Sequence, residues 1–176
     1  IAPCYYAVGN HESRLGKSYY TLEEQLLNVG AKILHDEVTQ INKDGASIQI
    51  IGLNDPRFAH KNTNVCYEKL LKMKLTDLNL QQGFKILLSH RPEAFRTYVS
   101  ADIDLVLSGH AHGGQFRIPI IGGLFAPNQG FLPKYDSGTF KEGRTTMVVS
   151  RGIGNSIVPV RLNNRPEIVS VQLHSV

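Results

Sequence analysis

The side chains best suited to chemistry lie at three points of the chain, each directly after an apolar segment: Asn10 and His11, then His90, then His110 and His112. Loops at strand ends are where a rigid sheet holds side chains against a ligand. Imidazole is the commonest metal-binding side chain, and residues two apart on an extended segment point to the same side. The pattern therefore favours a metal site at these three groups, without deciding which of the five side chains are ligands.

Each group also has a simpler explanation. A single histidine after a strand, such as His90, is more often a surface residue or a hydrogen-bonded core residue than a ligand. The Gly-His-Ala-His-Gly-Gly sequence at 109–114 is harder to explain that way, because its glycines let the backbone pass close to a bound ion or phosphate. Three such groups, each ending an apolar segment, together favour a site. Mixed nitrogen and oxygen donors suit Mn²⁺, Fe²⁺ or Zn²⁺ better than Ca²⁺ or Mg²⁺.

Composition narrows the class of protein. The 176 residues suit one domain, and 41% of them are apolar, enough for a sizeable core. No run approaches the roughly 18 apolar residues of a membrane span, so we expect a soluble globular domain. The net charge of +4 comes from scattered Lys and Arg, which provides no dedicated nucleic-acid surface and disfavours a nuclease, although anionic substrates still fit. Cys4 and Cys66 could form one disulfide, but two reduced thiols are favoured.

The pattern of apolar residues, caps and turns predicts an alternation of strands and helices. Mixed α and β elements with a mostly β second half favour two packed sheets flanked by helices, an α/β (α+β) fold. The expected strands are 1–8, 32–34, 37–41, 47–53, 84–88, 104–107, 145–150 and 168–173; the expected helices are 21–30 (capped by Thr21), 65–79 and 92–100; a hairpin turn is expected at 43–45, a polar loop at 54–64, and a long loop with brief strands near 115–118 at 113–143.

Three motifs carry a resemblance to a known family. The segments Gly9-Asn10-His11-Glu12, Ser89-His90-Arg91-Pro92 and Ser108–Gln115 resemble the last three signature motifs of the calcineurin-like metallophosphoesterases. Residues 116–156 are similar to the bacterial YkuE/YaeI-like subgroup. The resemblance covers nearly the whole chain, and the order of its motifs is highly specific.

The resemblance implies a four-layer αββα double-sheet sandwich with a dinuclear metal centre of Mn, Fe or Zn ions. It implies that Asn10, His90 and His110 hold one ion and His112 the other, that His11 protonates the leaving oxygen, and that Glu12 orients His11. The implied enzyme is a phosphoric ester hydrolase that cleaves phosphomonoesters or phosphodiesters by attack of a metal-bridging hydroxide. A catalytically inactive binding scaffold with the same fold is the alternative.

Two arginines are candidates for substrate binding. Arg57, in Asp55-Pro56-Arg57, could contact a phosphate with two hydrogen bonds, although a turn stabilised by Asp-Pro is the simpler interpretation. Arg91, next to His90, has the same two interpretations. The expected substrate is a small phosphate ester or a lipid or cell-envelope phosphate ester.

The sequence departs from the family at its start. The Asp-x-His and Gly-Asp motifs that open the family pattern do not precede Asn10, and Ile1 reads as part of a strand already in progress. We therefore expect residues 1–176 to be the C-terminal portion of a metallophosphoesterase domain, impaired in activity and able to bind one ion or none. We also expect self-association through an exposed sheet edge. Relatives in the subgroup often carry an amino-terminal anchor or export signal, so a membrane-anchored or exported parent protein fits the resemblance, and the residues themselves leave its localisation open.

Overall fold

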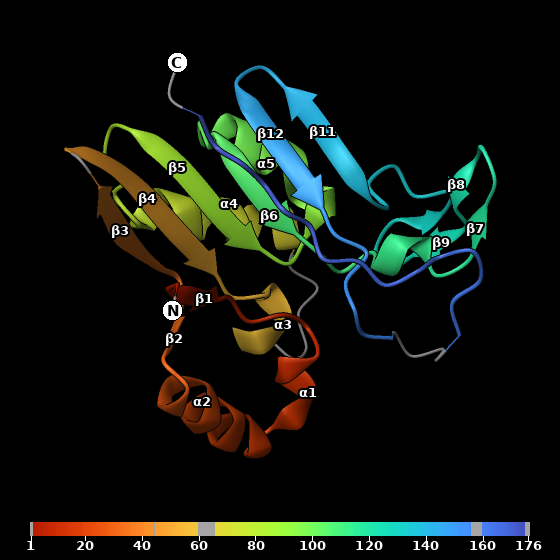
Figure 1. Cartoon of the computed structure of the whole chain (residues 1–176), viewed down its shortest axis with the longest axis horizontal. Helices are drawn as coiled ribbons and strands as arrows, with labels where there is room; N and C mark the ends of the chain where they lie inside the picture. Colours follow the sequence, from red (N-terminus) through yellow and green to blue (C-terminus); the bar gives the residue numbers. More distant parts are fainter. Residues whose placement is uncertain (1, 44, 60–65, 156–159, 175–176) are drawn as a thin grey trace.

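One mixed sheet of six strands forms the centre of the molecule (Figure 1). The computed structural model describes residues 2–43, 45–59, 66–155 and 160–174. In spatial order the strands are β11 (Gly138–Glu142), β12 (Thr145–Val149), β6 (Leu105–Ser108), β5 (Phe84–Ser89), β4 (Ala46–Leu53) and β3 (Glu37–Lys43). The four inner strands run parallel, and the two edge strands are antiparallel to their neighbours. The carboxyl ends of the inner strands therefore meet at one edge.

The helices α4 (Tyr67–Asp77) and α5 (Phe95–Ser100) pack with one face of this sheet. Leu87, Val106 and Met147 are adjacent in the strand register and are fully buried in the core beside the helices. Burying a side chain of this size is worth about 1.5–3 kcal/mol. This core fixes the strand ends that carry the candidate site.

The opposite face of the sheet is covered more thinly. Leu107 and Val148 are paired in the register and line a hollow together with Ile168, Val169 and Val171 of the C-terminal segment. A separate parallel pair, β1 (Cys4–Tyr6) and β2 (Ala31–Ile33), lies beside α2 (Ser18–Asn28). Within the described ranges there is one large sheet and three two-stranded pairs. The mixed α/β class fits the metallophosphoesterase type, and the four-layer arrangement stays a prediction.

Most of the predicted elements are present. The hairpin of β3 and β4, the helix α4, the strands β5, β6 and β12, and the turn of 3₁₀ helix Pro92–Ala94 that leads into α5 all occur close to their expected ranges. The predicted hairpin turn includes Asp44, which lies outside the described residues. Cys4 and Cys66 are free and exposed, in agreement with reduced thiols.

Four predictions about local structure are wrong. Helix α2 begins at Ser18, so Thr21 is inside it; the buried Tyr19 ring packs on Phe58 with centroids 4.8 Å apart, and this contact favours the earlier start. The polar loop contains a short helix, α3 (Pro56–Ala59), whose first turn is set by the Arg57 N–H donating to Asp55 Oδ1. Residues 168–173 form no strand, and the long loop ends earlier, at β11.

Residues 115–135 form a projection that we call the hairpin lobe. It contains the antiparallel pairs β7 (Arg117–Ile118) with β8 (Gly122–Gly123), and β9 (Phe125–Ala126) with β10 (Gly130–Phe131). Gly114 has a φ of +74°, and a Cβ there would lie 2.3 Å from Gly123 Cα, so only glycine fits where the lobe joins the sheet. No helix in the described part of the chain is long and apolar enough to cross a membrane.

Candidate functional site

His90 and His110 lie at the carboxyl edge of the six-stranded sheet, as the strand directions require, and Asn10, from the separate β1–β2 pair, meets them there. Asn10 follows β1 after Gly9, His90 follows β5, and His110 lies two residues after β6. His90 Nε2 lies 2.8 Å from Asn10 Oδ1, and the His90 and His110 rings have centroids 4.8 Å apart. We call Asn10, His90 and His110 the inner cluster. Residues eighty positions apart in the sequence thus share one hydrogen bond.

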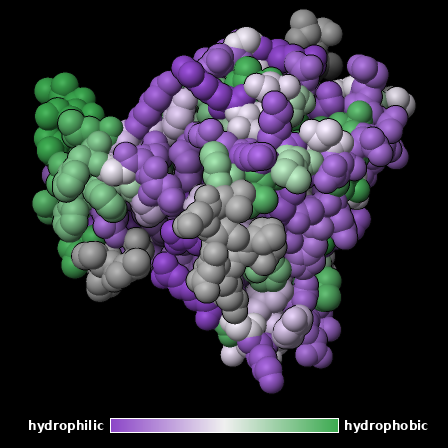
Figure 2. Space-filling view, turned by 180° about the vertical axis from the view of Figure 1, so that it is seen from behind, coloured by the Kyte–Doolittle hydropathy of each residue, from purple (hydrophilic) through white to green (hydrophobic). Residues whose placement is uncertain are grey.

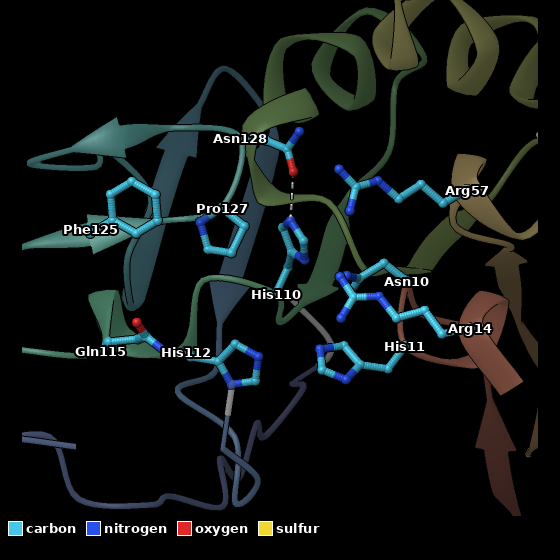
Figure 3. Close-up of a pocket in the computed structure, with 10 residues that line it drawn as sticks. All are labelled: Asn10, His11, Arg14, Arg57, His110, His112, Gln115, Phe125, Pro127 and Asn128. Carbon is cyan, nitrogen blue, oxygen red and sulfur yellow. Dashed lines mark hydrogen bonds between the residues drawn. The ribbon is translucent and has the colours of Figure 1, made fainter. Parts of the chain in front are cut away.

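The other two histidines, His11 and His112, form a second pair with ring centroids 6.1 Å apart. A pocket of about 420 Å³ is lined by this pair and by Asn10 and His110 of the inner cluster (Figure 3). Its lining comprises Asn10, His11, Arg14, Arg57, His110, His112, Gln115, Phe125, Pro127 and Asn128. In Figure 3, Arg14 and Arg57 lie on one side of the histidines, and Phe125 and Pro127 lie on the other. The pocket therefore has a cationic wall and an apolar wall.

Local backbone chemistry explains several residue types in the motifs. A Cβ at Gly9 would lie 3.0 Å from Glu12 Oε2 and 3.1 Å from the His90 ring, so glycine permits this approach. His110 and His112 have φ values of 67° and 48°, a left-handed conformation that is uncommon for side-chain-bearing residues. Asn164, buried in the C-terminal segment, donates to the backbone oxygens of His112 and Gln115 at 2.6 and 3.0 Å. These contacts hold the loop after β6 in its strained form.

Burial keeps the imidazoles of the inner cluster neutral. It lowers the pKa of His90 to about 4 and, with the nearby Arg91 charge, the pKa of His110 to about 3. Burial and the nearby Arg161 charge also lower the pKa of His112. A neutral ring has a free lone pair for a cation. The His110 tautomer that donates from Nε2 to Asn128 Oδ1, 3.1 Å away, leaves that lone pair on Nδ1.

An ion pair of Arg91 and Asp55 lies directly behind the inner cluster. Arg91 is fully buried, and its Nε and Nη2 donate to Asp55 at 2.5 and 2.9 Å. Its Nη1 also donates to Glu93 and Asn128 and lies 3.1 Å from His110 Nε2. Burial alone would raise the pKa of Asp55, but the Arg91 hydrogen bonds and charge outweigh burial and hold it below its usual range. The pair ties the loop after β4 to the loop after β5.

The structure separates the two arginines that the sequence placed together as substrate-binding candidates. Arg57 lines the pocket, whereas Arg91 is buried behind it with its guanidinium engaged. Glu12 accepts hydrogen bonds from Tyr6 Oη and from the Gly9 N–H, both at 2.9 Å, so it fixes the turn before His11. Substrate binding by either arginine and the orienting role of Glu12 stay predictions.

Sequence reasoning missed part of the pocket. Arg14 lies on the one-turn helix α1 (Glu12–Leu15), and the sequence offered no signal for it beyond its closeness to His11. Asn128 follows Pro127 and has a φ of 63°, a conformation typical of turns. The Pro-Asn pair therefore indicates a turn in the sequence and gives no sign of the contacts with His110 and Arg91. Phe125 of the hairpin lobe lines the pocket because the tertiary fold brings the lobe back to the histidines. The local sequence gives no sign of this position.

The inner cluster consists of neutral side chains of types that bind divalent ions. The inner cluster offers one amide oxygen and two neutral imidazoles, a set that binds transition metals. In the ranges that the structure describes, three or more His, Cys, Asp or Glu side chains do not gather as a metal-binding group. The two carboxylates whose charges act on His90, Asp55 and Glu12, are hydrogen-bonded elsewhere. The candidate ligands are therefore two imidazoles and one amide, with no carboxylate ligand beside them among the described residues.

Comparison with known proteins places the chain in a family. No protein-family model matches it. The phosphodiesterase YaeI of Escherichia coli is 28% identical over 98% of this chain and 58% of the relative. The uncharacterized metallophosphoesterase YkuE of Bacillus subtilis is 35% identical over 75% of this chain and 42% of the relative. A metallophosphoesterase of Campylobacter jejuni is 34% identical over 96% of this chain and 41% of the relative. The chain spans about half the length of these relatives, and it belongs to the calcineurin-like metallophosphoesterase family.

Proposed function

We propose that this chain carries a phosphate-ester hydrolysis site of a metal-dependent phosphoesterase, acting on phosphomonoesters or phosphodiesters. The observation that supports it most directly is one pocket with a cationic wall that is lined by Asn10, His11, His110 and His112. His90 contacts Asn10 and His110 of this lining. The names of the relatives agree with this reaction class.

Each residue has a role in this proposal. Asn10, His90 and His110 hold one divalent ion, and His112 contributes to a second. Divalent ions, when bound, lower the pKa of water and neutralise phosphate charge. His11, on the pocket wall, delivers a proton to the departing oxygen, a step worth about 10²–10⁴-fold in rate. Arg57 contacts the phosphate oxygens. Arg91, held by Asp55, donates to the Asn128 side-chain oxygen that also accepts from His110 Nε2, and in this way it keeps the His110 ring in place.

The test uses bis(p-nitrophenyl) phosphate with Mn²⁺ and four forms of the chain. His110→Ala should abolish Mn²⁺ binding and turnover together, because it removes a ligand. His11→Ala should lower turnover by about 10²–10⁴-fold while Mn²⁺ binding by calorimetry stays unchanged. His174→Ala changes an exposed histidine distant from the pocket motifs and should match the unmodified chain. Turnover that survives His110→Ala would refute the proposed function.

One observation favours the binding-scaffold alternative for this chain: its inner cluster lacks a carboxylate ligand among the described residues. Three neutral ligands hold a transition metal more weakly than a set that includes carboxylates. Mn²⁺ binding that requires His90 and His110 but gives no turnover would therefore support the scaffold. Membrane anchoring or export, and self-association of the chain, remain predictions.

A further inference from the structure

The hairpin lobe exposes large apolar side chains at two tips. Ile120 is fully exposed, and Ile121, Phe131 and Leu132 are 63%, 77% and 61% exposed. Figure 2 shows the lobe as a strongly hydrophobic projection at the left edge of a mostly hydrophilic surface. Scattered apolar residues are ordinary on protein surfaces, but a contiguous apolar projection marks a binding surface.

The backbone conformation of the two turns does not explain why they carry large apolar residues. Ile120 and Leu132 have φ values of 73° and 51°, a region where glycine and asparagine are favoured and bulky side chains are strained. A polar or glycine residue at either position would be exposed with less backbone strain. The apolar side chains therefore need a reason outside the turn itself.

The lobe is held firmly behind its tips. Arg117 Nη1 donates to Asp136 Oδ2 at 2.7 Å, and the Gly123 N–H donates to the same oxygen at 2.6 Å. The Phe125 and Phe131 rings pack edge to face, with centroids 5.6 Å apart. The apolar side chains at the tips are therefore exposed on a lobe whose structure is fixed by several tertiary hydrogen bonds.

The charge of the lobe favours an anionic partner. No Asp or Glu occurs from Ile118 to Tyr135, and Lys134 adds a positive charge beside the Leu132 tip. Asp136, the next carboxylate, is paired with Arg117. Two convex apolar tips with no negative charge suit insertion into a membrane surface that carries anionic headgroups, where apolar side chains enter about 5–10 Å.

We propose that the hairpin lobe binds an anionic lipid surface through Ile120, Ile121, Phe131 and Leu132. This binding needs no catalysis and goes beyond the proposed function. Phe125 both packs on Phe131 and lines the pocket, so lobe binding brings the pocket mouth to the lipid surface.

The chain contains no tryptophan, which allows a site-specific test. Phe131→Trp gives the protein a single fluorescent tryptophan at the tip, and Val29→Trp gives one at an exposed position that ends α2, away from the lobe. On addition of phosphatidylglycerol vesicles, without metal or substrate, Trp fluorescence of Phe131→Trp should shift to shorter wavelength. The Val29→Trp spectrum should stay unchanged, and vesicles of phosphatidylcholine should give a weaker shift.

Two further variants test the tips and the charge in the Phe131→Trp background. Ile120→Ser combined with Leu132→Ser should weaken vesicle binding at least about tenfold, because two apolar side chains no longer enter the lipid. Lys134→Glu should weaken binding to phosphatidylglycerol more than to phosphatidylcholine. An unshifted Phe131→Trp spectrum in a folded protein would overturn the proposal. So would equal shifts in both tryptophan variants, or a shift that depends on protein concentration without vesicles, which indicates self-association. Loss of phosphoesterase activity would leave the vesicle result unaffected.

Discussion

The buried pair of Arg91 and Asp55 gives a prediction whose magnitude follows from the contacts. Arg91→Met leaves the fully buried Asp55 carboxylate without its two charged donors, and it also removes the donor to Asn128. Breaking a buried ion pair in this way costs about 3–5 kcal/mol. Asp55→Asn should cost less, about 1–3 kcal/mol, because Arg91 keeps Glu93 at 3.2 Å and the Asn side-chain oxygen can still accept from Arg57 N–H.

A double-mutant cycle measures the coupling. The Asp55→Asn/Arg91→Met protein has no uncompensated buried charge at either position, so its destabilisation should be smaller than the sum of the single effects by about 1.5 kcal/mol or more. The measurement is urea unfolding followed by circular dichroism at pH 7, with equal m-values for all four proteins. Additivity within about 0.5 kcal/mol would refute the view that the two charges depend on each other.

The same ion pair predicts how the folding stability of the chain changes with pH. The folded-state pKa of Asp55 is below its ordinary value, so the pair contributes fully above that ordinary value, about 3.9, and the contribution is lost as the pH falls through the folded-state pKa. The stability difference between the unmodified chain and the double variant should therefore shrink on acidification below about pH 4. A difference that stays constant from neutral pH to pH 2 would contradict the assigned cause.

Three other predictions concern stability, each measured by the same unfolding assay. Leu87→Ala removes a fully buried side chain and should cost about 2–5 kcal/mol, whereas Leu27→Ala at an exposed position should stay within about 0.5 kcal/mol; equal losses would contradict the core assignment. Gly114→Ala places a Cβ 2.3 Å from Gly123 Cα at a φ of +74° and should cost about 2 kcal/mol or more, and a neutral effect would show that the lobe packs differently. Because the φ of residue 112 is positive, His112→Gly should be more stable than His112→Ala by about 1 kcal/mol, and the reverse order would argue against that backbone conformation.

The parallel strands of the sheet were predictable from sequence because each is short, apolar and bounded by turn residues. Phe84–Ser89 and Leu105–Ser108 occur almost as expected, since both are short, mostly apolar segments with buried residues in the core. The segment 168–173 is also short and rich in apolar residues, with polar residues at 170 and 172, yet it forms no strand. A strand needs a hydrogen-bonding neighbour, and the residue pattern of one segment does not reveal whether a neighbour is beside it.

The candidate site likewise contains residues that the sequence could place and residues that it could not. His90 and His110 could be placed together because parallel strands end at a common edge. Arg91 could not be placed, because a buried arginine and a phosphate-binding arginine have the same local sequence; its role depends on Asp55, 36 positions earlier. Asn128 reaches His110 from a loop whose path is set by close packing of glycines. Such contacts follow from tertiary packing and have no signature in the sequence.

The buried Asn164 amide has a consequence for how the two histidine pairs respond to damage at the C-terminus. Its hydrogen bonds to the loop of His112 are made from a segment without regular secondary structure. Proteolytic cleavage between Gly152 and Asn164 should therefore release His112 from its backbone support while His90 and His110, supported by neighbouring sheet strands, keep their contact. One half of the pocket thus depends on the integrity of the chain's last segment, and the other half does not.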